Sequence, residues 1–540
     1  MQRRKFVRNT LIAGWVLPNI TLYSCSQVES PINTQQSSSP DYSSFELEEI
    51  TVNELQEKMA NGALTAAAIT QMYLDRIEQI DKNGPQLNSV IEVNPDALSI
   101  AQELDEERKN GNIRGPLHGI PVIIKDNINT GDKMMTTAGS LVLDGNYAGE
   151  DAPIVVKLRA AGAILLAKAN LSEWANFRSS RSSSGWSSRG GQCKNPYILD
   201  RNPCGSSSGS GASVSANLCM IAIGTETNGS IVCPSNNNGV VGIKPTVGLW
   251  SRTGIIPISF TQDTAGPMAR TVTDAAILLG PLAGEDPKDS KTAEITGKYN
   301  QDYTQFLDAD GLNGARLGII KDLMGFHEKV DAGLEAVFEK MRAKGATIVE
   351  LESPEEWRGL GSAGLTVLNY EFKDGLKKYL ETVNPPSGVK TLADIIAYNQ
   401  ENADQIMPYF QQERMDGAEE SGEMNDPKYL EALKKSVEQS RKGIDRLLTE
   451  NNLDALLGPT GGPAWTIDVI NGDRFGGGSS SPAARAGYPN ITVPAGMVEG
   501  LPFGLSFFGT AFSEPELIKL AYAFEQATKM RKAPEFKATL

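Results

Sequence analysis

The hydrophobic positions near the start of the chain follow the spacing of two surface helices. From residue 51 apolar residues recur every three or four positions, and Thr51 with Glu54 has the spacing of a capping box, which marks a helix start. A second run of the same spacing ends at Asn83-Gly84-Pro85, a sequence that stops helices. We therefore expect the folded body to begin near residue 45 with two helices.

Short apolar runs of strand length follow, and helical patterns separate several of them. The runs cover residues 120–124, 163–167, 220–223, 316–320, 347–351, 453–457, 491–493 and 505–508. Helical spacing is found over residues 153–161 and 332–343 and from residue 514 onward. Continuous apolar runs of this length are typical of strands buried on both faces. The alternation predicts an α/β fold in which helices cover both faces of a mixed central β-sheet.

The remaining segments favour one large domain over residues 45–540. Residues 369–450 have a mostly helical and polar pattern, and we interpret them as an insertion or rim of the same domain. The glycine- and serine-rich run 476–481 ends at Pro482 and strand signals follow it, so we expect an ordered loop there.

The first 44 residues have the composition of an export signal and a tether. Residues 1–25 open with four basic residues, continue through an apolar run and end in Leu-Tyr-Ser-Cys25. The basic start resembles a twin-arginine signal, and the end resembles a bacterial lipoprotein cleavage box. Residues 26–44 are polar and serine-rich, as in a flexible tether. We expect export to the cell envelope with a lipid on Cys25; the alternative is a frayed, basic amphipathic end.

Composition and charge exclude several classes of function. The chain has 540 residues, of which 40% are hydrophobic, as in ordinary globular proteins. It carries 51 Lys and Arg against 66 Asp and Glu, and the net charge of -15 disfavours a nucleic-acid partner. The two histidines, His118 and His327, are too few for a multi-histidine metal site. We expect no metal or organic cofactor and no obligatory protein partner.

The cysteines of the body follow no metal-ligand spacing. They are Cys193, Cys204, Cys219 and Cys233. Cys219 lies in an apolar run and has the character of a core residue. A disulfide between Cys193 and Cys204 is one option, whereas folding before twin-arginine export would favour reduced thiols.

Three segments in the centre of the chain carry candidate chemistry. In the first, Lys125 follows the strand-like run 120–124. Burial would lower its pKa and make it a base near neutral pH, although such a lysine can also extend its amine to solvent. The second is the Ser/Gly loop 204–212, which lacks the Gly-Lys-Ser or Gly-Lys-Thr of a phosphate-binding loop. In the third, residues 224–234, Ser230 lies on a Gly-Ser turn as a candidate nucleophile or as an ordinary β-turn residue.

Together these segments resemble the amidase signature family, serine hydrolases with a Ser-Ser-Lys arrangement. The resemblance runs from about residue 50 to the C-terminus and includes Leu117-His-Gly-Ile-Pro-Val122 and Asp263-Thr-Ala-Gly-Pro-Met-Ala-Arg270. Within the family the chain is most similar to bacterial peptide amidase, through Tyr370-Glu-Phe-Lys373, Pro463-Ala-Trp465 and Ile491-Thr-Val-Pro-Ala-Gly496. The implied fold is a single amidase-signature domain.

The resemblance also implies roles for individual residues. Ser230 would be the acyl-enzyme nucleophile, Ser206 the bridging hydroxyl and Lys125 the base, with a cis peptide bond before Ser206. The oxyanion would bind the backbone N–H groups of Thr227, Asn228, Gly229 and Ser230. The pocket walls would include Tyr370, Trp465 and Phe475, although single aromatics more often belong to the core. Glu226 and Asn228 stand where many relatives have Asp and Gly, and His118 would lie in a structural turn.

We therefore expect an amidase that hydrolyses carboxamide C–N bonds, with C-terminal peptide amides or amino acid amides as substrates. A hydrolase of small aliphatic or aromatic amides is an alternative within the family. A transamidating component for charged transfer RNA is another, and export and acidic charge argue against it. A surface lipoprotein that binds amides without turnover is the alternative from a different class.

Overall fold

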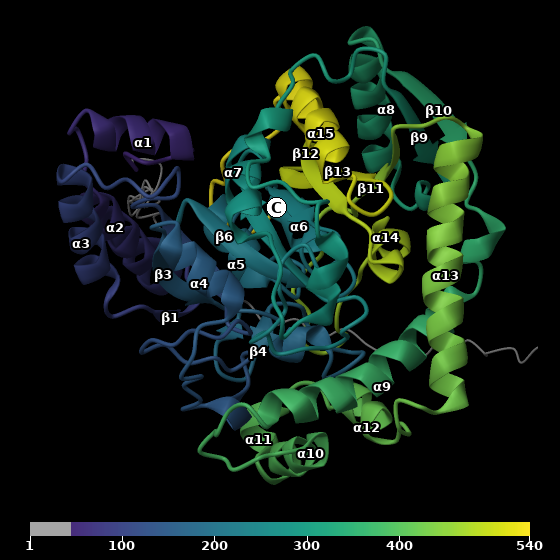
Figure 1. Cartoon of the computed structure of the whole chain (residues 1–540). Coiled ribbons are helices and arrows are strands. Elements are labelled where there is room, and N and C mark those ends of the chain that lie inside the picture. The colour runs from purple at the N-terminus through teal and green to yellow at the C-terminus, as the bar shows by residue number, and fades with distance from the viewer. Residues whose placement is uncertain (1–44) are drawn as a thin grey trace, which may run out of the picture. The chain divides into compact units, whose positions relative to one another are not determined.

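An eleven-stranded mixed β-sheet runs through residues 45–540, the part of the chain that the computed structural model describes (Figure 1). Its order is β1-β3-β2-β6-β8-β7-β12-β13-β11-β9-β10. The strands are β1 Val90–Val93, β2 Pro121–Lys125, β3 Ile164–Ala169, β6 Ile221–Glu226, β7 Val241–Lys244, β8 Thr264–Ala269, β9 Arg316–Ile320, β10 Thr347–Leu351, β11 Ala455–Pro459, β12 Asn490–Val498 and β13 Leu501–Phe508. The predicted signal and tether, residues 1–44, lie outside the described residues.

Two parallel groups of strands are joined by antiparallel ones. Strands β3, β2 and β6 pair in parallel, as do β10, β9 and β11. Strands β8, β7, β12 and β13 connect the groups through antiparallel pairs. In Figure 1 the β3 side of the sheet lies at the left and the β9 and β10 side at the upper right. The prediction of an α/β domain with a mixed central sheet is confirmed. A separate small sheet pairs β4 Trp186–Ser187 with β5 Gly191–Gln192.

Helices flank the sheet and include those that the sequence pattern predicts. They are α1 Val52–Ala60, α2 Ala66–Arg76, α3 Ala97–Lys109, α4 Pro153–Ala160, α5 Ser208–Ser215, α6 Val232–Asn237, α7 Val272–Leu282, α8 Glu328–Ala343, α14 Ser480–Ala486 and α15 Glu514–Thr528. Thr51 and Glu54 form the expected capping box at the start of α1. The second predicted helix ends at Asn83 as expected, but its last part, Ile77–Asn83, is a π-helix.

The region that we interpret as a helical insertion contains five helices within the same fold. They are α9 Leu360–Leu380, α10 Leu392–Glu401, α11 Ala403–Ile406, α12 Glu413–Glu419 and α13 Pro427–Glu450. Figure 1 shows α9 beside α12 and in contact with α13. Among residues 45–540, no helix is both long enough and apolar enough to cross a membrane.

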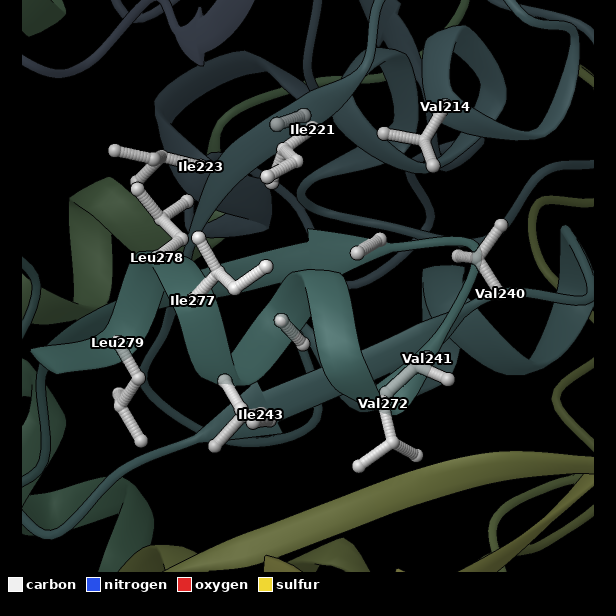
Figure 2. Close-up of a cluster of buried hydrophobic side chains, with 14 of the residues drawn as sticks. Val214, Ile221, Ile223, Val240, Val241, Ile243, Val272, Ile277, Leu278 and Leu279 are labelled. Carbon is white, nitrogen blue, oxygen red and sulfur yellow. The ribbon is translucent and has the colours of Figure 1, made fainter. Parts of the chain in front are cut away.

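Strand β6, which leads to Ser230, packs into the hydrophobic core between the sheet and α7. Figure 2 shows apolar side chains of α7, among them Val272 and Leu278, gathered with Ile221 and Ile223 of β6 and with Ile243 of β7. All five side chains are fully buried. Because these contacts hold β6 along its length, they fix the position at which the strand ends and the next turn begins.

Candidate active site

Lys125 is the last residue of β2, and its amine is buried among oxygen atoms. The Nζ atom lies 2.8 Å from Ser206 Oγ, 3.0 Å from Ser207 Oγ and 2.9 Å from Thr225 Oγ1. It also lies 3.2 Å from the carbonyl oxygen of Thr225. Burial lowers the pKa of Lys125 to about 7, although the charges of Asp263 and Glu226 act in the opposite direction. The lysine is thus neutral in a large share of molecules near neutral pH, and the alternative of a solvent-extended amine is wrong.

Ser206 lies in the serine loop just before α5, and its hydroxyl is the closest to Lys125 Nζ. The peptide bond between Gly205 and Ser206 is cis, as the family resemblance implied. A Cβ atom on Gly205 would lie 2.1 Å from Ser172 Oγ, so a side chain there would displace the Ser172 hydroxyl. The neighbouring Ser208 hydroxyl donates to the carbonyl oxygen of Cys204 at 2.6 Å. These contacts hold the loop and keep the Ser206 hydroxyl beside the amine.

Ser230 lies on the turn between β6 and α6, and Glu226 holds that turn. The buried Glu226 carboxylate accepts the backbone N–H of Gly229 at 2.8 Å, of Ile231 at 2.8 Å and of Val232 at 3.1 Å. The backbone N–H of Ser207 donates to the carbonyl oxygen of Ser230 at 3.2 Å. The turn and the serine loop are therefore in direct contact, and Ser230 is 8% exposed.

The predicted oxyanion site needs one correction, because Glu226 already engages the N–H of Gly229. A buried carboxylate needs hydrogen-bond donors, and Glu226 takes this one. Within the described part of the chain, the N–H groups of Thr227, Asn228 and Ser230 have no protein acceptor. These three groups remain available to a developing negative charge on a substrate oxygen.

A disulfide ties the two serine segments together. It joins Cys204, two residues before Ser206, to Cys233, three residues after Ser230. The option of a Cys193–Cys204 pair is therefore wrong, as is the expectation of reduced thiols for these two residues. Cys193 and Cys219 are unpaired and buried. Spacing along the chain carries no signal for this pairing, because the two residues meet only when the loop before α5 packs against α6.

Two cavities open beside the Ser230 turn. The first, which we call the Asn228 cavity, has a volume of about 310 Å³ and is lined in part by Asn228, Gln262 and Leu368. The second, the Thr225 cavity, has about 500 Å³ and is lined in part by Thr225 and Thr227. A substrate bound at Ser230 would thus find room next to the turn.

The three aromatic residues predicted as pocket walls have different surroundings. Tyr370 is buried on α9, stacks on Tyr429 and donates its hydroxyl hydrogen to Asp426 Oδ2 at 2.7 Å. Tyr370 does not line the Asn228 cavity, because it lies about half a turn of α9 away from the residues that face that cavity, and its role as a pocket wall stays a prediction. Trp465 and Phe475 have ring centroids 6.2 Å apart, and neither lines the Asn228 cavity.

Trp465 and Phe475 nevertheless lie on a segment that contacts residues near both the serine loop and the Ser230 turn. The carbonyl oxygen of Trp465 accepts the N–H of Asn202 at 2.7 Å, four residues before Ser206. Further along, a Cβ atom on Gly229 would lie 3.1 Å from Ser480 Oγ. Their role in substrate binding stays a prediction.

Neither histidine belongs to this arrangement. His118 is buried in the turn before β2, where its Nε2 atom lies 2.9 Å from the carbonyl oxygen of Leu104. His327 caps α8 through a 3.4 Å contact between its Nδ1 atom and the N–H of Val330. Proton transfer at Ser230 must therefore use groups other than imidazole.

Comparison with known proteins identifies the family over most of the chain. A family model described as Amidase matches residues 68–518, and the chain belongs to that family. It is accordingly a hydrolase that acts on amide bonds. The crystal structure of native peptide amidase from Stenotrophomonas maltophilia is similar, at 50% identity and a TM-score of 0.88, covering 91% of this chain and 99% of that one.

Curated relatives come from several kingdoms. A probable amidase of Arabidopsis thaliana is 44% identical over 504 residues, which are 92% of this chain and 93% of the plant protein. A putative amidase of the fission yeast Schizosaccharomyces pombe is 39% identical over an alignment that covers 99% of this chain and 94% of the yeast protein. A component of the glutamyl-tRNA(Gln) amidotransferase of Carboxydothermus hydrogenoformans is 34% identical over 520 residues, 91% of this chain and 99% of the bacterial one.

Proposed function

We propose that this chain removes the amide from the C-terminus of peptides or from amino acid amides, with Ser230 as nucleophile. The observation that carries the proposal is the 2.8 Å contact between Lys125 Nζ and Ser206 Oγ, in a buried site where the lysine pKa is about 7. A neutral amine can accept a proton from Ser206, and Ser206 can accept one from Ser230.

The proposed reaction proceeds through an acyl-enzyme. Ser230 Oγ bonds to the carbonyl carbon of the amide, its proton passes to Ser206, and the proton of Ser206 passes to Lys125. The oxyanion accepts hydrogen bonds from the backbone N–H groups of Thr227, Asn228 and Ser230. As the C–N bond breaks, Ser206 returns a proton to the nitrogen, and ammonia leaves. Water then attacks the ester on Ser230, and the same relay takes its proton. As the C–O bond to Ser230 breaks, the relay returns that proton to Ser230 Oγ, and the free acid leaves.

The choice of peptide amides rests on similarity to peptide amidase. The 50% identity and TM-score of 0.88 to the Stenotrophomonas enzyme support a related substrate. The two cavities beside the Ser230 turn offer more room than a small aliphatic amide needs. The similarity to the amidotransferase supports the family, while the net charge of -15 disfavours contacts to RNA.

We also propose that the chain is exported and carries a lipid on Cys25, because the first 25 residues have the charge order and terminal Cys of such signals. Intact mass spectrometry of protein purified from membranes tests this proposal. The expected mass lacks the first 24 residues and includes a diacylglyceryl group. A soluble protein with an unmodified Cys25 would contradict it.

The amidase proposal is tested by incubating the purified protein with a C-terminally amidated peptide. Released ammonia and a product heavier by one mass unit are expected, and a Ser230→Ala variant should give neither. Turnover of small amides but not of the peptide would favour the small-amide alternative. A folded protein that turns over no member of a broad amide panel would favour the non-catalytic binder.

A further inference from the structure

Arg485 lies at the end of α14 without a counter-charge. Its side chain is partly buried, and burial lowers the pKa of the guanidinium. Among residues 45–540 it has no salt bridge and no side-chain hydrogen bond to the protein. Because a desolvated cation without a partner is costly, the position points to an anion that comes from outside the chain.

Arg414 and Arg485 both line the Asn228 cavity, and the side chain of Arg414 is also unpaired. Its backbone N–H donates to the carbonyl oxygen of Arg178 at 3.1 Å, which fixes the start of α12, but its guanidinium has no protein partner in the described residues. The adjacent Glu413 carboxylate is engaged elsewhere, by Ser179 Oγ and by the N–H of Ser180, both at 2.8 Å. Two arginines thus face one cavity with their charges unneutralised by the protein.

The other residues that line the Asn228 cavity leave these two arginines accessible. One face of α9 supplies Gly361, Gly364, Leu365 and Leu368, at helical spacing, and no lining residue is acidic. A Cβ atom on Gly364 would lie 3.3 Å from Arg485 Nε, so the glycine leaves room for the guanidinium. The wall is therefore apolar on one side and cationic on the other.

The cavity is connected to the reacting centre through Asn228. That residue lies two positions before Ser230, and its Oδ1 atom accepts the hydroxyl of Ser480 at 2.9 Å. Ser480 begins α14, the same short helix that ends near Arg485. A peptide whose C-terminal carbonyl is bonded to Ser230 can therefore extend a side chain from the turn toward the two arginines.

We infer that the Asn228 cavity is a subsite for an acidic side chain of the substrate, bound as a carboxylate by Arg414 and Arg485. The inference rests on the proposed peptide amidase function and names its substrate class, amidated peptides with Asp or Glu at or next to the C-terminus. A guanidinium presents paired N–H donors that match a carboxylate, and the volume of about 310 Å³ accommodates such a residue.

The test compares kcat/KM for three amidated dipeptides: N-acetyl-Leu-Met-NH2, N-acetyl-Leu-Glu-NH2 and N-acetyl-Glu-Leu-NH2. The wild-type protein should prefer at least one acidic peptide over the neutral one. Arg414→Met and Arg485→Met should each lower kcat/KM for that peptide by about 10- to 100-fold, mainly through KM, because each removes a charged hydrogen bond. The neutral peptide should change by less than about 2-fold, which also shows that the variants fold.

Arg342→Met is the matched control, because it removes the same charge from α8, which contributes nothing to the cavity. It should leave all three values unchanged, and Arg485→Lys should restore part of the preference. Equal rates on acidic and neutral peptides, or an equal loss on both in the arginine variants, would overturn the subsite while the amidase proposal stands. Absence of ammonia from every peptide would overturn both.

Discussion

Cys204 and Cys233 are joined by a disulfide, and they bracket the two serines of the site. One lies two residues before Ser206 and the other three residues after Ser230. The same two segments are joined by the hydrogen bond from the N–H of Ser207 to the carbonyl oxygen of Ser230. The serine loop and the nucleophile turn are therefore held to each other covalently as well as by a backbone hydrogen bond.

The disulfide should matter for stability and for turnover. It closes a loop with a sequence separation of 29 residues. Chain-entropy arguments give such a cross-link about 3 to 4 kcal/mol of stabilisation. We expect a Cys204→Ser/Cys233→Ser variant to lose about that free energy of unfolding in urea titrations, with a reduced kcat. Reductant should destabilise the wild type and leave this variant unchanged. A non-reducing peptide map without a Cys204–Cys233 cross-link would contradict the account.

Glu226 should be needed to hold the nucleophile turn. Its carboxylate accepts three backbone N–H groups, and Glu226→Ala would leave buried donors unpaired, at about 1 to 3 kcal/mol each. We expect kcat to fall by about 10- to 100-fold if even part of that energy positions Ser230. Glu294→Ala, on an exposed carboxylate, is the control and should leave kcat unchanged. Wild-type activity in Glu226→Ala would show that the turn forms without the carboxylate.

The rate should depend on pH through Lys125. Only the neutral amine accepts a proton, and burial lowers its pKa to about 7. For a neutral amide substrate, kcat/KM should therefore fall about tenfold per pH unit on the acid side of the lysine pKa and reach a plateau on its alkaline side. Lys125→Arg, whose guanidinium stays charged, should lose about 10²- to 10⁴-fold in rate across the whole range. A profile without an acid limb would exclude lysine as the base.

Much of the fold follows from hydrophobic pattern alone, and the exceptions have physical causes. The parallel strands β2 and β9 are almost continuous apolar runs because both of their faces are buried. Strand β8 carries no such signal, since its sequence is Thr-Ala-Gly-Pro-Met-Ala. A Cβ atom on Gly266 of β8 would lie 2.0 Å from the carbonyl oxygen of Ile243, so the neighbouring backbone requires glycine where a strand usually has a large residue.

Only part of the candidate site, too, could be predicted from the sequence. Lys125 and Ser206 could be named from motifs, and they are in contact. The hydrogen bond from the Gly229 N–H to Glu226 could not be predicted from motifs, because it depends on how far the Glu226 side chain reaches. Nor could the pairing of Cys204 with Cys233, or the unpaired state of Arg485, since both depend on which distant segments pack together.

The most direct test of the relay is the labelling of Ser230 by a fluorophosphonate, followed by intact mass and peptide mapping. The reagent reacts with a serine that a neighbouring base activates, so its rate reports the relay without reference to any amide. We predict one label, on Ser230, in the wild type, and labelling slowed by about 10²- to 10⁴-fold in Lys125→Met and in Ser206→Ala. A label on another residue, or equal labelling rates in all three proteins, would contradict the Ser-Ser-Lys account.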